Sequence, residues 1–255
     1  MRMRKPVKRG NSGQLLIVAA LAIAVLISST TMYVYNLSKE DNSTDVQSIS
    51  DLVLALKQST KNAVISSLAN VSNGGAKSLL STNLDELSKA LRSIHMSGTC
   101  NLVSTVCNDS GYSFGTRLSW NDSGKGASSA FANFTQQVYG LASEATTRYS
   151  VNVTTTLAVN GSYVISGGTE KNVSLTCKVY NDAQQALAKN LTVFYFDGGS
   201  WVQVNASNSL SILDYGDGMY LVSFTVNVAD PVQTSVYLTD LRDILVRTNV
   251  TCSAT

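Results

Sequence analysis

Apolar residues follow three different patterns along this chain of 255 residues. They form one uncharged run over 14–35, recur at helical spacing within 36–147, and alternate with polar residues within 148–255. An uncharged apolar run of this length is typical of a membrane-spanning helix, and alternation is typical of strands with one buried face. The pattern therefore predicts an α+β protein: a transmembrane or stalk helix, a mostly helical region, and a C-terminal antiparallel β-sandwich.

The region 36–147 contains three apolar stripes at helical spacing. They fall within 46–68, 84–94 and 130–145, and each predicts an amphipathic helix with one buried face. The first helix could continue from the membrane helix as a stalk. A short strand pair is expected within 112–120, between the second and third helices.

Beyond residue 148 the alternation predicts seven or eight short strands. Turn sequences separate them, among them the Gly-rich segments 197–200 and 214–218. This number of strands over about 100 residues suits an immunoglobulin-like sandwich. The clearest strands are expected at 151–159, 173–179, 190–196, 201–204, 222–228 and 244–252.

The uncharged run 14–35 is flanked by charge on one side only. Five basic residues precede it: Arg2, Arg4, Lys5, Lys8 and Arg9. As a helix of 22 residues it would extend about 33 Å, enough to cross a bilayer. Because Lys and Arg stay on the cytoplasmic side, we expect a cytoplasmic leader over 1–13 and an extracellular C-terminus. The alternative is a cleaved signal peptide, but no small-x-small cleavage site follows the apolar core.

The start of the chain carries a resemblance to a known family. Lys8-Arg9-Gly10, followed by the apolar run from Gln14, is similar to the beginning of archaeal type IV pilin-like proteins. The resemblance covers about the first 35 residues. It implies that a basic leader is cut after a glycine, Gly10 or Gly13, in front of the helix. It also implies that the helix stays in the membrane or forms the core of a filament.

N-glycosylation sequons are frequent beyond the apolar run. Ser and Thr make up about 23% of the chain, so its 20 asparagines would give about four or five Asn-x-Ser/Thr sites by chance. Twelve occur, which predicts a heavily N-glycosylated surface, although a Ser/Thr-rich β-protein could produce some of the pattern passively. They are Asn36, Asn42, Asn70, Asn108, Asn121, Asn133, Asn152, Asn160, Asn172, Asn190, Asn205 and Asn249.

The four cysteines are expected to form disulfides, because an even number in an exported chain is typical of them. Of the three connectivities we favour Cys100–Cys107, which would close a short loop, and Cys177–Cys252, which would join two strands. A four-thiolate metal site is not favoured, since no paired Cys-x-x-Cys spacing occurs.

Charge and motifs give little indication of chemistry. Outside the leader, 14 basic residues stand against 17 acidic ones, with no basic patch for nucleic acid. The single histidine, His95, ends the second expected helix and is read as a helix-end partner. Asp214 and Asp217 lie in a turn but lack the ligand count of a calcium loop. We therefore expect no catalytic residues, no cofactor, no metal and no nucleic-acid partner.

The sequence thus predicts a single-pass cell-membrane protein, glycosylated outside the cell, with a structural, adhesive or filament-assembly role. Its expected partners are membrane lipid, through 14–35, and pilin-like subunits or envelope proteins. The main alternative is a monomeric surface module that binds a small solute or polysaccharide. A surface hydrolase without a recognisable motif is a weaker alternative. Four aromatic residues are candidates for the binding role: Tyr195, Trp201, Tyr215 and Tyr220.

Overall fold

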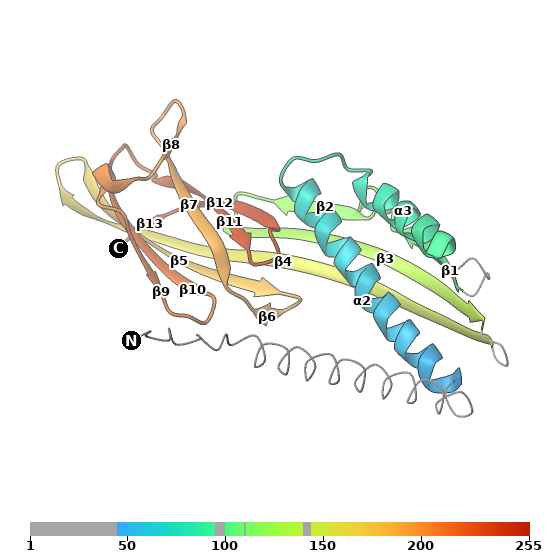
Figure 1. Cartoon of the computed structure of the whole chain (residues 1–255). Coiled ribbons are helices and arrows are strands. Elements are labelled where there is room, and N and C mark those ends of the chain that lie inside the picture. The colour runs from blue at the N-terminus through green and yellow to red at the C-terminus, as the bar shows by residue number, and fades with distance from the viewer. Residues whose placement is uncertain (1–44, 95–99, 110, 140–143) are drawn as a thin grey trace, which may run out of the picture. The chain divides into compact units, whose positions relative to one another are not determined.

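The computed structural model describes residues 45–94, 100–109, 111–139 and 144–255 (Figure 1). Residues 52–139 and 144–255 form one compact unit, to which the following paragraphs refer. The expected leader and membrane helix lie outside the described residues, as do Gly10, Gly13, Asn36, Asn42 and His95. None of the helices in the described ranges combines the length and the apolar character that a bilayer crossing requires.

A large antiparallel sheet, here called sheet A, contains nine strands in the described part of the chain. Its main path runs β1 (Cys100–Val106), β3 (Lys125–Tyr139), β4 (Glu144–Gly167), β5 (Glu170–Asn181), β10 (Met219–Asn227) and β9 (Ser211–Asp214). Three short strands pair beside this path: β2 (Thr116–Trp120) with β3, β6 (Gln184–Gln185) with β5, and β13 (Ser253–Ala254), parallel to β4.

A second sheet, sheet B, has the order β12 (Leu245–Thr251), β11 (Gln233–Asp240), β7 (Ala188–Phe196) and β8 (Trp201–Gln203). A 3-10 turn, η2 (Ala206–Asn208), follows β8. The inward residues of both sheets form one apolar cluster. It consists mainly of valines and leucines at every second position of each strand. The two sheets therefore enclose a common core, as in a β-sandwich.

Two helices cover the other part of sheet A (Figure 1). They are α2 (Asp45–Ser72) and α3 (Leu79–Ile94), and α2 ends where Gly74 takes a positive φ of 97°. Ser88 on α3 donates to the carbonyl of Leu102 on β1 at 2.7 Å. Thr60 on α2 shares a 3.1 Å hydrogen bond with the Tyr149 hydroxyl on β4. The long β3–β4 hairpin thus packs against helices at one end and against sheet B at the other.

The expected helix at 130–145 is wrong, because Lys125–Tyr139 form strand β3. Ala130, Phe134 and Val138 lie four residues apart, a spacing that keeps side chains on one face of a helix but also on one face of a strand. Gln136 is buried between two of them, and Phe131 lies on the opposite face, so the alternation is hidden in the sequence. The spacing of apolar residues in this segment therefore fits a helix as well as a strand.

The expected boundary between residues 147 and 148 is also wrong, because β4 runs through it without a break. The region 36–147 is not mostly helical in its described part: beyond α3 it contains β1, β2, β3 and the start of β4. The first two helices and the 190–204 hairpin, formed by β7 and β8, are confirmed. The structure is therefore mostly antiparallel sheet with few helices.

A candidate binding groove

Most acceptor asparagines in the described residues lie on the surface. Ten of the twelve fall in these ranges, and all except Asn249 are exposed. Four of the exposed ones, Asn133, Asn152, Asn160 and Asn172, project from the outward face of sheet A. Asn249 differs because it is half-buried and its Nδ2 donates to Asp122 Oδ1 at 2.8 Å.

All four cysteines are free thiols in the structure. The expected Cys100–Cys107 bond is wrong, because β1 occupies Cys100–Val106 and an extended strand separates the two residues by about 23 Å. Cys177 and Cys252 do lie in the same buried core cluster, but they are not bonded to each other. Burial raises the pKa of the Cys177 thiol to about 12 and raises the pKa of Cys252 as well.

The outward face of sheet B carries a row of aromatic side chains. Leu191 and Tyr195 of β7 pack on the core, so Phe194 and Phe196 face outward. Phe194 meets Tyr237 of β11 edge-to-face, with ring centroids 5.0 Å apart, and Phe196 meets Trp201 of β8 at 5.5 Å. Trp201 is 42% exposed.

Arg247 of β12 links this row to Trp120 of β2. Its guanidinium carbon lies 4.6 Å from the Trp120 ring centroid and 5.4 Å from that of Tyr237, and Nη1 donates to the Tyr237 hydroxyl at 2.8 Å. Trp120 Nε1 donates to Ser128 Oγ at 3.1 Å. The Trp120 indole thus contacts Ser128 of sheet A and Arg247 of sheet B. The Arg247 guanidinium likewise contacts Trp120 of sheet A and Tyr237 of sheet B.

A glycine allows the two sheets to meet at this point. A Cβ on Gly126, the residue that pairs with Trp120, would collide with the carbonyl oxygen of Arg247. Ser128, two residues further along β3, donates to the Leu245 carbonyl at 2.6 Å. The close approach of β12 to β3 brings Trp120 next to the outward face of sheet B.

These residues enclose two adjoining hollows, which together we call the aromatic groove. The first, of about 270 Å³, is lined by Trp120, Asn121, Trp201, Ser235, Tyr237, Arg247, Thr248 and Asn249. The second, of about 240 Å³, is lined by Asp122, Trp201, Gln233, Asn249, Val250 and Thr251. Trp201 and Asn249 belong to both. Aromatic faces with amide, hydroxyl and carboxylate groups at the rim are suited to a ligand that is apolar on one face and rich in hydroxyls.

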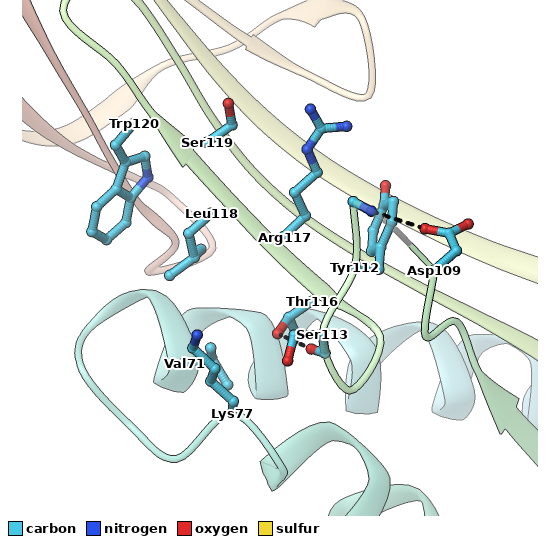
Figure 2. A pocket seen from close by; sticks show the side chains of 11 residues that line it. Val71, Lys77, Asp109, Tyr112, Ser113, Thr116, Arg117, Leu118, Ser119 and Trp120 are labelled. Atoms are coloured by element: carbon cyan, nitrogen blue, oxygen red, sulfur yellow. Dashed lines mark hydrogen bonds between the residues drawn. The ribbon is translucent and has the colours of Figure 1, made fainter.

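A larger hollow of about 630 Å³ is also lined in part by Trp120 (Figure 2). Lys77, Asp109 and Arg117 line it together with Tyr112. Hydrogen bonds from the Cys107 thiol and the Gly111 amide lower the pKa of Asp109. Figure 2 shows Arg117, Tyr112 and Asp109 near one another and Lys77 apart from them.

Of the four aromatic candidates named from the sequence, only Trp201 lines the groove. Tyr220 is buried and its hydroxyl accepts from the Ala188 amide at 2.8 Å, and Tyr195 packs against the core. Tyr215 is exposed in the turn between β9 and β10.

The turn at 214–218 is confirmed. The Asp214 side chain accepts from the Gly216 amide at 2.8 Å and Asp217 from the Met219 amide at 3.0 Å. In the described ranges no three His, Cys, Asp or Glu side chains gather as a metal site would require.

Sequence reasoning missed Trp120, Tyr237 and Arg247. Tyr237 and Arg247 each occupy the polar phase of an alternating strand, which was a usable signal for an outward position. Their contact with Trp120 depends on how the sheets close, and no local pattern shows it. Comparison of the chain with models of known protein families finds no match, and comparison with curated proteins finds no relative.

Proposed function

We propose that this chain is a membrane-anchored, N-glycosylated extracellular protein of pilin-like type, with a structural, adhesive or filament-assembly role. One observation carries the proposal: a basic flank and an uncharged run over 14–35 precede all twelve acceptor asparagines. Charge asymmetry of this kind orients a span with its C-terminal side outside, where N-glycans are added. The two-sheet unit would be an immunoglobulin-like domain displayed by the anchor.

The composition of the exposed surface supports an environment-facing role. The outward side of β5 presents Asn172, Ser174, Thr176 and Lys178, so hydroxyl and amide groups outnumber charges there. A surface of this kind depends on sugars and neutral polar groups for its hydration, since charged residues make up only 14% of the chain.

The anchor is tested by one substitution at the centre of the apolar run. Ala24→Arg in the full-length protein should shift it from the membrane fraction, because a central Arg costs about 2.5–3.5 kcal/mol in membrane insertion. Ala24→Leu is the matched control and should leave the membrane fraction unchanged. Protease added to intact cells should digest the wild-type C-terminal region. A C-terminal region that is protected in intact cells and digested after lysis would overturn the proposal.

The alternative, a monomeric surface module that binds a solute or polysaccharide, remains a prediction. It would require the aromatic groove to be open to an external ligand.

A further inference from the structure

We propose that the aromatic groove is the docking site of an N-glycan carried by the protein's own Asn121, and that neighbouring Asn249 stays unmodified. This inference rests on the proposed glycosylation and specifies where one glycan packs. Both asparagines are acceptor sites, and both line the same hollow. The backbone N–H of Asn249 donates to the backbone carbonyl of Asn121 at 2.9 Å. Two glycans starting from these two residues would compete for one groove.

The side-chain hydrogen bonds distinguish the two acceptors. Asn121 is exposed, and its Oδ1 accepts from the amide of Ser123 at 3.2 Å and from its hydroxyl at 2.9 Å. Ser123 is the hydroxyl residue of the same sequon, and Asn121 Nδ2 makes no hydrogen bond within the described part of the chain. Asn249 Nδ2 instead donates to Asp122, and the side chain is half-buried.

The chemistry of glycosylation requires a free Nδ2. The amide nitrogen bonds to C1 of an activated sugar phosphate, the C1–O bond to phosphate breaks with its electron pair on the leaving oxygen, and Nδ2 loses one proton. In Asn249 one Nδ2 proton is already engaged by the Asp122 carboxylate. Asn121 is therefore the acceptor that the geometry favours.

The groove matches the surface of a sugar ring. A pyranose has an apolar C–H face and a rim of hydroxyls, and Trp201 offers an exposed indole face beside Trp120. Asp122 and Gln233 supply acceptors and donors at the rim. Asn121 directly follows Trp120 and is one of the residues that line the groove, so a glycan on Asn121 would start next to it. Tethering gives the glycan a high effective concentration there.

The docked glycan would cover aromatic surface that is otherwise open to water. Trp201 and Phe196 form a contact pair at the free edge of sheet B, where exposed aromatic side chains favour contact with another molecule. A glycan packed on this edge would both stabilise β8 and block edge-to-edge pairing. The acceptor Asn160, opposite Thr176 on the outward face of sheet A, is not among the residues that line the groove and serves as a control.

The test combines glycopeptide mapping with a double-mutant cycle on full-length protein from the glycosylating host. Peptides containing Asn121 should carry glycan, and those containing Asn249 should not. Asn121→Gln should lower Tm by about 2–4 °C in the otherwise wild-type protein. The same substitution should change Tm little when Trp201 is already replaced by Ala. With Trp201→Phe, Asn121→Gln should still lower Tm. Asn160→Gln should act additively with Trp201→Ala. Acrylamide quenching of tryptophan fluorescence should increase in Asn121→Gln.

Several results would overturn the inference. Glycan on Asn249, or a bare Asn121 while Asn133 or Asn160 is occupied, would contradict it and leave the proposed surface glycoprotein intact. Additive effects of Asn121→Gln and Trp201→Ala would also contradict it. Retention of the glycosylated wild type on a polysaccharide column, lost in Trp201→Ala, would assign the groove to an external ligand. Absence of glycan at every site would contradict the glycosylation itself.

Discussion

Replacing Gln136 with Met should stabilise the protein. Gln136 lies on the inward face of β3, opposite Leu102 on β1 and Thr147 on β4, and none of its surface is exposed. Neither Oε1 nor Nε2 has a hydrogen-bond partner within the described residues. Native proteins rarely leave a buried amide in this state, because both polar atoms lose their hydrogen bonds to water on folding.

The magnitude follows from that loss. A buried, unsatisfied polar group costs about 1–3 kcal/mol, and Met has almost the same length and shape as Gln without the polar atoms. Gln136→Met should therefore raise the free energy of unfolding by about 1–3 kcal/mol. For a folded unit of this size each kcal/mol raises Tm by about 2–4 °C.

The assay is denaturant unfolding of the purified full-length protein. The denaturant concentration at the midpoint is compared between variant and wild type, provided that the m-value is the same for both. Gln137→Met is the matched control: Gln137 is half-buried on the opposite face of β3, and its Oε1 accepts from Asn101 Nδ2 at 3.2 Å. The Gln137→Met variant should therefore show no increase in the free energy of unfolding. If Gln136→Met instead lowers stability by 1 kcal/mol or more, the Gln136 amide has a partner, such as a bound water, and the reasoning is refuted.

Two further predictions concern the core and its thiols. Gly161→Ala should cost about 1–3 kcal/mol, because the new Cβ would lie 2.5 Å from Cys252 Sγ, while Gly167→Ala, with open space around it, should be neutral in the same unfolding assay. Iodoacetamide at pH 8 should label Cys107 in the native protein, because that thiol is only half-buried, and spare Cys177, which is fully buried and whose pKa burial raises to about 12. After denaturation without reductant all four cysteines should react, and labelling of only two would reveal a Cys177–Cys252 disulfide.

The sequence predicted correctly those strands and helices in which apolar residues are buried and polar residues face outward. In β5, Val173, Leu175, Cys177 and Val179 are all buried while the residues between them face outward, so the alternation identified the strand. The stripe of α2 was equally readable, because its buried positions recur every three or four residues. Both elements bury one face against one partner layer.

β1 and β3 were not predictable in the same way. β3 places a glutamine in the core and a phenylalanine outside, so its alternation is masked. β1 buries only Cys100 and Leu102 of its seven residues, and the pairing with β3 supplies the rest of its stability. Local pattern cannot reveal a strand whose main support is a partner strand 26 to 38 residues away in the sequence.

The candidate groove was predictable only in part. Trp201 was one of four aromatic residues named from the sequence as candidates for binding, but Trp120 and Arg247 lie 127 positions apart in the chain. Their contact exists because Gly126 lets β12 approach β3. The acceptor sites were all readable as motifs, whereas the difference between Asn121 and Asn249 depends on hydrogen bonds that only the fold creates.

The mature N-terminus of the protein from native membranes tests the central claim most directly, and mass spectrometry can determine it. We expect a chain that begins at Asn11 or Gln14 and retains the whole apolar run 14–35, as pilin-type processing after Gly10 or Gly13 would produce. An intact Met1 would preserve the anchor but contradict the pilin-like assignment. A chain that begins beyond Ser29 would lack the apolar segment, and it would contradict the membrane-anchored account altogether.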